Sequence, residues 1–412
     1  GTVASAVTIS GGSFTSAAKR AINFDAIVSK AVKISEVAGS SVDNTIAFAD
    51  LRAPLTLTSA TATSTAGTSL VISAMTAATS ISITGGTFNG AHRGIYFAAV
   101  DAGTAISISG ATFTAVESAI DIDDLQAPLA LKNVVATAST AGAALELTAV
   151  AAAATSISIT GGSFTGAEGG IHFLSAIDAA TSVALVGVAV EATTAENALH
   201  FAGAVTGPVT ISGGTFAQNA VTKSAINFQA TVSAPLTISH ATAVSLTTAI
   251  NIADLQAPLT LTGVTATAST LGHAVSVFTA SAATTISIAG GSFTGSRRGL
   301  YFGALDASTA VTISGAAVQA TNNGPALLFV GAVASPVTIT GGSFTQTVAT
   351  RNAIVFQGAV TAVVTMSDVT ATSASTAILF ADLQAPLALT NVAATASSAL
   401  DGLSFTATSA AA

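Results

Sequence analysis

The chain has 412 residues, of which 50% are hydrophobic and only 7% are charged, and it contains no cysteine. This composition is too apolar for a disordered chain, and it excludes thiol catalysis, thiolate metal sites and disulfides. A net charge of −8 with 11 scattered Lys and Arg residues provides no basic stripe for nucleic acid. Ser, Thr or Gly interrupts every apolar run within a few residues, so we expect no membrane span.

A four-residue signature, apolar-polar-apolar-polar, recurs along the whole chain. The first copy begins at Val7 and the last at Leu387, 380 residues later in fifteen steps, so the mean period is about 25 residues. The sixteen copies begin at Val7, Val32, Leu55, Ile81, Ile106, Leu129, Ile157, Val183, Val209, Leu236, Leu259, Ile286, Val311, Val337, Val364 and Leu387.

Two further apolar elements follow the signature in each period. The second is a Gly-Gly-(Ser/Thr)-Phe turn with a short strand, as at Phe14 and Phe88, and the third is an apolar-x-apolar strand, as at Ile22/Phe24. Alternation with a period of two in β-branched and aromatic residues predicts strands. The abundant alanine would favour helix, but the apolar residues never sustain a helical spacing.

Three short strands with one apolar face each cannot bury themselves, so neighbouring repeats must stack. We therefore expect an all-β fold, a parallel β-helix of about 16 coils with about 25 residues and three short strands per coil. This pattern resembles the right-handed parallel β-helix (pectate-lyase-like) superfamily, closest in character to its structural and adhesin members. The resemblance covers nearly the whole chain and implies a right-handed β-solenoid. It carries over no catalytic residue, because the outward strand face is Thr/Ser here.

A longer repeat groups the coils into blocks. Coils of one class, called class b, end in Asp-Leu-Gln-Ala-Pro, as in Asp124–Pro128, and class d coils contain Gly-(Ile/Leu)-(Tyr/His)-Phe followed by an acidic loop, as in Gly94–Phe97 with Asp101. These classes divide the chain into blocks 7–105, 106–208, 209–336 and 337–412. We expect a single β-solenoid domain, 1–412, built by duplication.

The residues with catalytic or metal-binding chemistry are isolated. Copies of the class b aspartate lie several coils apart, too far for paired-carboxylate hydrolysis, and a turn role explains them. Asp121 and Asp123 fall on one outward face, but calcium sites recruit more oxygens. The five histidines lie in separate coils: His92, His172, His200, His240 and His273. We therefore expect no catalytic residue, no metal, no cofactor and no enzymatic activity.

The outward positions of the signature strand form a two-lane ladder of hydroxyl groups. Its members include Thr8, Ser10, Thr56, Thr58, Thr210, Ser212, Thr260, Thr262, Thr338 and Thr340. Three uses compete: solubility, attachment of O-linked sugars, and binding of an ordered lattice such as ice or a carbohydrate fibre. Lys33, Ala130 and Ala184 interrupt the ladder, so ice binding is a minor alternative.

Class d coils supply the second functional hypothesis, a carbohydrate-binding or carbohydrate-active β-helix. Aromatic and charged side chains gather there and could hold a sugar, or form lateral contacts between solenoids. The candidate residues are His92, Arg93, Tyr96, Arg297, Arg298 and Tyr301. Basic residues such as Arg351 recur in another coil class and are further candidates for lateral contact.

The leading hypothesis is a structural protein. The chain is already in a coil at Val7 and still in one at Phe405, with no capping helix in the pattern. Open coil ends are templates for pairing, so we expect head-to-tail self-association into a filament. Low charge, block duplication and the lack of chemistry indicate an extracellular or cell-surface fibre, with glycans as further partners.

Overall fold

The computed structural model describes residues 1–412 except 78, 152–155, 195, 349–350, 399 and 409–412. Every regular element among these residues is a β-strand, and none is a helix. The described part of the chain accordingly contains no helix long and apolar enough to cross a membrane. The all-β prediction is confirmed.

The chain divides into two compact units, Gly1–Pro208 and Val209–Ala412, called unit 1 and unit 2. This boundary falls where the second sequence block ends and the third begins. Each unit contains eight coils, and every coil contributes one strand to each of three parallel sheets, called A, B and C; a short strand at Thr2–Val3 precedes the first coil and adds to sheet A. The single-domain expectation stays a prediction.

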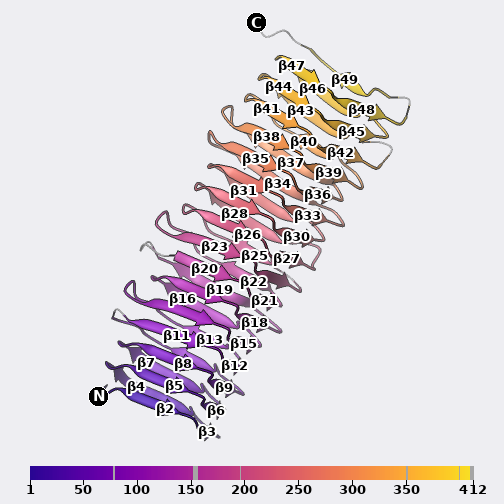
Figure 1. Cartoon of the computed structure of the whole chain (residues 1–412). Coiled ribbons are helices and arrows are strands. Elements are labelled where there is room, and N and C mark those ends of the chain that lie inside the picture. The colour runs from indigo at the N-terminus through magenta and orange to yellow at the C-terminus, as the bar shows by residue number, and fades with distance from the viewer. Residues whose placement is uncertain (78, 152–155, 195, 349–350, 399, 409–412) are drawn as a thin grey trace. The chain divides into compact units, whose positions relative to one another are not determined.

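Unit 1 contains strands β1 to β25 (Figure 1). Sheet A comprises β1 (Thr2–Val3), β4 (Ile22–Val28), β7 (Ile46–Leu51), β10 (Leu70–Ile72), β13 (Ile95–Phe97), β16 (Ile120–Leu125), β19 (Ala143–Val150), β22 (Gly169–Phe173) and β25 (Leu199–Phe201). Sheet B comprises β2 (Val7–Ser10), β5 (Val32–Ser35), β8 (Leu55–Thr58), β11 (Ser80–Thr84), β14 (Ala105–Ser109), β17 (Leu129–Lys132), β20 (Ser156–Thr160) and β23 (Ser182–Val186). Sheet C comprises β3 (Ser13–Ser16), β6 (Ala38–Ser41), β9 (Thr61–Ser64), β12 (Thr87–Gly90), β15 (Thr112–Ala115), β18 (Val135–Ala138), β21 (Ser163–Gly166) and β24 (Ala189–Ala192).

Unit 2 contains strands β26 to β49 in the same order of sheets. Sheet A comprises β28 (Ile226–Val232), β31 (Ile250–Leu255), β34 (His273–Ala280), β37 (Arg298–Leu305), β40 (Leu327–Phe329), β43 (Ile354–Val360), β46 (Ile378–Leu383) and β49 (Leu403–Phe405). Sheet B comprises β26 (Val209–Ser212), β29 (Leu236–Ser239), β32 (Leu259–Thr262), β35 (Thr285–Ala289), β38 (Ala310–Ser314), β41 (Val337–Thr340), β44 (Val364–Ser367) and β47 (Leu387–Thr390). Sheet C comprises β27 (Thr215–Gln218), β30 (Thr242–Ser245), β33 (Thr265–Ala268), β36 (Ser292–Gly295), β39 (Ala317–Ala320), β42 (Ser343–Gln346), β45 (Thr370–Ser373) and β48 (Ala393–Ala396).

Within each unit, a strand pairs in parallel with the strand of the same sheet one coil later. In sheet B, for example, Val7 lies opposite Val32, and in sheet A Tyr301 lies opposite Leu328. Equivalent residues of successive coils therefore stack on one another, so the strand register follows from the sequence repeat. The predicted parallel β-helix, with about 16 coils and three strands per coil, is confirmed.

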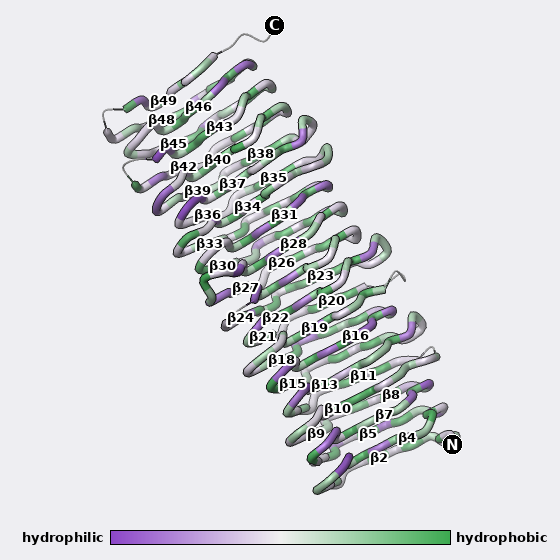
Figure 2. The backbone as a smooth tube through the Cα atoms, turned by 180° about the vertical axis from the view of Figure 1, so that it is seen from behind, coloured by the Kyte–Doolittle hydropathy of each residue, from purple (hydrophilic) through white to green (hydrophobic). Residues whose placement is uncertain are grey.

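The interior of each unit is built from these stacked apolar side chains. Most sheet B strands bury the two apolar residues of the signature, as in the buried Leu55 and Leu57, and leave the alternate ones exposed or half-exposed. Hydrophobic stretches consequently recur coil after coil along the chain (Figure 2). Phenylalanines stack face to face between coils of sheet A, with ring centroids 4.8 Å apart for Phe329–Phe356 and 4.6 Å apart for Phe356–Phe380. Aromatic stacking of this kind adds to the energy of burial.

The corner between sheets B and C requires a left-handed backbone. The residue that follows each of the sixteen signatures has a positive φ, and most of these residues are glycine, as the Gly-Gly turns predicted. The non-glycine exceptions are Glu36, Ser59, Asn133, His240, Asp368 and Asn391. His240, with φ of 52°, thus has a backbone role at a corner.

Candidate functional site

The two tyrosine-containing class d coils place similar side chains at equivalent positions in the two units. Tyr96 lies at the centre of β13 and Tyr301 lies on β37, and in each coil an arginine stands three residues earlier, Arg93 or Arg298. The glycine between them allows the chain to pass close to the next coil, since a Cβ on Gly299 would lie 2.3 Å from the Val318 side chain. Outward alternation then turns the tyrosine away from the core.

In unit 1 these groups form a closed set of internal contacts. The Arg93 guanidinium lies 4.8 Å from the centroid of the Tyr96 ring and forms an ion pair with Asp121 of the next coil. The Tyr96 hydroxyl donates a hydrogen bond to Asp123. His92 Nδ1 lies 2.8 Å from a Glu117 carboxylate oxygen. Every member of this cluster therefore has a partner within the unit.

The unit 1 carboxylates are partly buried beneath the arginine. The side chain of Asp121 is only 5% exposed, and burial raises the pKa of Asp121 to about 6 against the opposing effect of Arg93. Burial and the bond to Asp123 raise the pKa of Tyr96 to about 12. Sequence alternation predicted that Asp121 and Asp123 share an outward face; Asp123 is half-buried, whereas Asp121 is buried beneath its neighbours. The described residues contain no group of three or more His, Asp or Glu side chains suited to a metal ion.

In unit 2 the equivalent groups form a basic and aromatic cluster. The Arg298 guanidinium lies 5.1 Å from the centroid of the Tyr301 ring. The His273 ring from β34 stacks on the Tyr301 ring, with ring centroids 4.8 Å apart and an interplanar angle of 12°. The Phe278 ring centroid lies 6.3 Å from that of Tyr301. Burial, then the charges of Arg298 and its neighbour Arg297, lower the pKa of His273 to about 3. The imidazole is consequently neutral at physiological pH.

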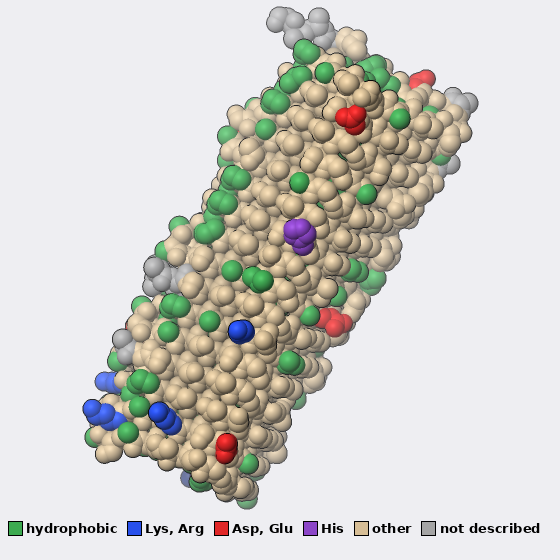
Figure 3. Space-filling model, in the orientation of Figure 1, with side chains coloured by type: hydrophobic (Ala, Val, Ile, Leu, Met, Phe, Trp, Pro, Cys, Tyr) green, Lys and Arg blue, Asp and Glu red, His purple; other side chains and the backbone are tan. Residues whose placement is uncertain are grey.

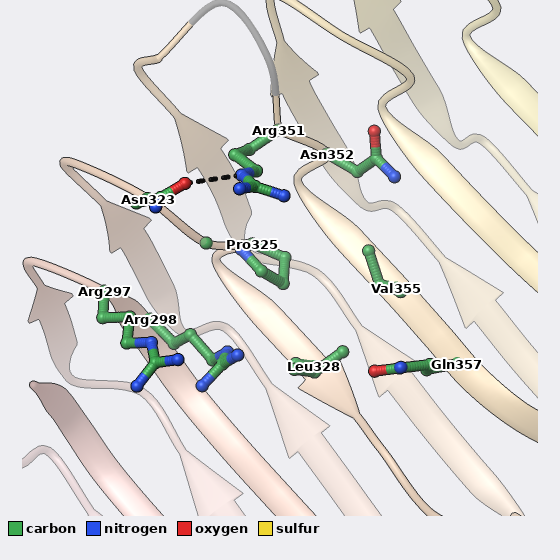
Figure 4. A pocket seen from close by; sticks show the side chains of 10 residues that line it. Arg297, Arg298, Asn323, Pro325, Leu328, Arg351, Asn352, Val355 and Gln357 are labelled. Atoms are coloured by element: carbon green, nitrogen blue, oxygen red, sulfur yellow. Dashed lines mark hydrogen bonds between the residues drawn. The ribbon is translucent and has the colours of Figure 1, made fainter.

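The arginines of the unit 2 cluster differ from Arg93 in their ionic surroundings. Within the described residues, Arg297, Arg298 and Arg351 have no Asp or Glu at ion-pair distance. Burial lowers the pKa of Arg298, and the like charge of Arg297 lowers it further. The Nε atoms of Arg298 and of its unit 1 counterpart Arg93 are both buried without a hydrogen-bond acceptor, but only Arg93 has a carboxylate beside it. Arg351 Nε donates to the Asn323 side-chain oxygen at 2.7 Å (Figure 4).

The difference between the units originates one coil beyond the tyrosine. Register places Tyr96 opposite Asp121 and then Glu146, whereas it places Tyr301 opposite Leu328. Val355 follows Leu328 in the next coil. Two carboxylates in unit 1 are thus replaced by two apolar side chains in unit 2, so the arginines there remain uncompensated.

Three adjoining pockets surround the unit 2 cluster and share the Arg297 side chain. One pocket spans three coils and brings basic groups from two of them together with an apolar strip (Figure 4). Its lining residues include Arg297, Arg298, Asn323, Pro325, Leu328, Arg351, Asn352, Val355 and Gln357. A second holds Tyr301, His273 and the 62% exposed Phe278. None of the lining residues is acidic. We call this surface, centred on Arg297, Arg298, Tyr301 and Arg351, the basic surface.

The hydroxyl ladder lies where the sequence predicted it, on the outward face of sheet B, and polar and backbone atoms cover most of the face in Figure 3. Thr8, Ser10, Thr58, Thr210 and Thr340 are exposed. The other members are half-exposed: Thr56, Ser212, Thr260, Thr262 and Thr338. Register extends the first lane of unit 2 through seven consecutive hydroxyl residues: Thr210, Thr237, Thr260, Ser287, Thr312, Thr338 and Thr365.

The remaining polar candidates have structural partners. In class b coils the glutamine two residues after the aspartate donates to its carboxylate, as Gln126 does to Asp124 at 2.7 Å. The class d loop aspartates accept backbone hydrogen bonds within their own turns, as Asp306 does from Ser308 at 2.8 Å. His172 is buried with its ring edge toward His200, at 5.3 Å. Burial lowers the pKa of His172 to about 4.

Sequence reasoning did not place Arg351 beside Arg297 and Arg298. They are more than fifty residues apart and were assigned to different coil classes. The missed signal is their similar distance from sheet A: register aligns Leu300 with Leu327 and then with Ile354, and Arg298 and Arg351 precede Leu300 and Ile354 by two and three positions. No protein-family model matches the chain, and no curated protein or solved structure shows significant similarity to it.

Proposed function

We propose that this chain is a structural β-solenoid of an extracellular fibre or cell surface, without enzymatic activity. The observation that carries this proposal is the coil-on-coil repetition of chemistry within each unit. Phe329, Phe356 and Phe380 stack inside, while hydroxyl side chains stay in register outside. A repeated core of this kind resists local opening, because each coil is held by both neighbours.

In this proposal the chain is a structural or adhesin-like member of the right-handed parallel β-helix superfamily. The outward Thr and Ser side chains keep a protein with few charges in solution, and they offer acceptors for O-linked sugars. Copies of the chain associate with one another to form the fibre.

Electron microscopy of the purified chain over a range of concentrations tests the structural role. We expect fibres or ordered bundles whose number increases with concentration. A uniform population of monomers at every concentration, with sedimentation showing no self-association, would overturn the proposal. The same preparation incubated with polysaccharides tests the enzymatic alternative, which predicts shortened products.

Carbohydrate binding is a second candidate function, and the basic surface favours it. Tyr301 and Phe278 provide partly exposed rings beside three arginines. Aromatic faces pack against the apolar faces of ring-shaped ligands, while a few polar groups fix their orientation. A structural fibre that also binds a glycan would be an adhesin, so the two candidates are compatible.

A further inference from the structure

We propose that the basic surface of unit 2 binds an acidic glycan, a sugar chain that carries carboxylate or sulfate groups. This inference rests on the carbohydrate-binding candidate and names the class of its ligand. The residues assigned to recognition are Arg297, Arg298 and Arg351 for the anionic groups and Tyr301 for a sugar ring.

The first argument is charge. The protein is acidic, yet three of its 11 basic residues line one pocket of unit 2 and no acidic residue lines it. The basic pocket at Lys19 and Arg20 in unit 1 differs, because Asp25 and Asp43 also line it. Like charges gathered without counterions raise the energy of the free protein. A bound anion would relieve this repulsion.

The second argument is hydrogen-bonding capacity. A guanidinium group presents five donors in a planar fork that suits two oxygens of a carboxylate or sulfate. Arg351 uses Nε on Asn323 and the Arg298 Nε is buried, so the terminal guanidinium nitrogens are the donors that can reach a ligand. The donors that remain free in Arg297, Arg298 and Arg351 line the same pocket. An oxyanion seated there would accept charge-assisted hydrogen bonds, which are stronger than neutral ones.

The third argument is the apolar part of the surface, which a small inorganic anion would not use. Pro325, Leu328 and Val355 line the pocket with the arginines, and Tyr301 with Phe278 lines the adjoining one. In Figure 4, Pro325 lies between the Arg297–Arg298 pair and Arg351. The ligand should therefore combine anionic groups with ring faces. An acidic sugar chain has both, spread over several residues.

Nucleic acid also combines anions with rings, but the rest of the molecule disfavours it. The net charge is −8, and the cluster contains only three arginines. Affinity for nucleic acid depends on neutralising many phosphates along a strand. Binding of a DNA oligonucleotide is therefore an outcome that the experiment must examine.

The experiment measures binding of the full chain to defined oligosaccharides by calorimetry. The probes are a uronic acid oligomer, a sulfated oligosaccharide, a neutral glucose oligomer and a single-stranded DNA oligonucleotide. We expect binding of the uronate, the sulfated probe or both, and no binding of the neutral probe. The two acidic probes distinguish the source of the anion. Preferential DNA binding would overturn the inference.

Variants test which residues recognise the anion. Arg298→Gln, Arg297→Gln and Arg351→Gln should each weaken binding about 10-fold, because each removes charge-assisted hydrogen bonds. Leu328→Asp should weaken it at least as much, by supplying the carboxylate that unit 1 places opposite its tyrosine. Leu328→Asn is its uncharged control. Arg52→Gln, at an arginine paired with Asp50, should leave binding unchanged.

The outcomes separate this inference from the broader candidate. If the neutral oligomer binds equally well and the arginine variants have no effect, the anionic inference is wrong while carbohydrate binding stands. If no oligosaccharide binds, both are wrong. Circular dichroism and thermal unfolding of each variant show whether a loss of binding reflects misfolding. The inference also requires that Leu328→Asn binds the acidic probe and that Leu328→Asp does not.

Discussion

Arg93 in unit 1 and Arg298 in unit 2 occupy equivalent places but differ in their electrostatic surroundings. Both guanidinium groups lie over a tyrosine ring, at 4.8 and 5.1 Å. Arg93 is neutralised by Asp121 of the next coil, while Arg298 has Leu328 opposite its tyrosine. The comparison teaches that the chemistry of a surface on this fold depends on residues about 25 positions further along the chain. A local motif alone does not determine it.

The two units differ in the charges on this surface, but we expect their interiors to be equally stable. Truncating a buried phenylalanine in either unit should have the largest effect of the changes considered. Phe356→Ala in unit 2 and Phe173→Ala in unit 1 each remove a fully buried ring from a stack. We expect each to cost about 3–5 kcal/mol of unfolding free energy, the usual range for a buried phenylalanine. Denaturant unfolding measures the loss of free energy for each variant, and hydrogen exchange shows in which unit the loss occurs. A loss confined to one unit would show that the cores differ as well as the surfaces.

The aromatic stack of unit 2 should make its stability depend on pH. The folded pKa of His273 is lowered to about 3, below the ordinary value of 6.5 that applies to the unfolded chain. Its contribution is therefore fully present above pH 6.5 and is lost as the pH falls toward 3. Allowing for partial exposure, we expect a loss on the order of 2 kcal/mol between pH 7 and pH 4.

His273→Gln should remove this part of the acid sensitivity. Thermal unfolding of the wild type and the variant from pH 7 to pH 4 measures the difference, and Ser276→Ala on the same strand is the control. His172 in unit 1, with its pKa lowered to about 4, contributes a further loss in both proteins. Identical pH profiles for wild type and His273→Gln would contradict the prediction.

Much of this comparison follows from the sequence, because its elements are periodic. The Val7–Ser10 signature and its copies predicted the sheet B strands, and Gly-Gly turns such as Gly11–Gly12 predicted the corners. The aspartates before the Pro corners were interpreted as turn residues, and Asp124 does bond to Gln126 nearby. Strand period and turn chemistry are local properties, so a single repeat reveals them.

The candidate site was only half predictable, since it joins residues from different coils. The class d pattern identified Arg298 and Tyr301, but the pairing of Arg93 with Asp121 required the register between coils. Coil lengths vary, so a position cannot be carried from coil to coil by adding a constant. Arg351 was missed as a neighbour of Arg298 for this reason. Handedness and self-association remain predictions.

Placing the unit 2 residues in unit 1 tests whether the residues opposite the tyrosine cause the difference between the two arginines. The double variant Asp121→Leu/Glu146→Val replaces the two carboxylates opposite Tyr96 with the residue types found opposite Tyr301. Arg93 then loses its counterion, and we expect a second, weaker site for the acidic oligosaccharide. A tenfold gain in affinity at unit 1 corresponds to about 1.4 kcal/mol. Calorimetry in a background that carries Arg297→Gln, Arg298→Gln and Arg351→Gln, which removes all three arginines of the unit 2 pocket, isolates this site.

The graft also has a matched control. Asp121→Asn/Glu146→Gln removes both charges but keeps polar side chains, so it should release Arg93 without creating the apolar strip. Binding to this control as strong as binding to the Leu/Val variant would show that charge alone is sufficient. Unchanged binding in both variants would contradict the idea that the opposing residue controls the arginine.

The smallest expected effect on stability is at the corner after the class b signature, where only the backbone conformation limits the choice of residue. Glu36 in unit 1 and His240 in unit 2 follow equivalent strands with φ of 54° and 52°. A left-handed conformation costs a non-glycine residue about 1 kcal/mol, whereas glycine loses more entropy on folding. Glu36→Gly and His240→Gly should therefore each stabilise the protein by about 0.5 kcal/mol or less.

Denaturant unfolding measures both variants, and the two gains should agree, because both side chains are exposed and the corner backbone is the same. Opposite signs in the two units would mean that one of these side chains contributes a contact that the backbone argument omits.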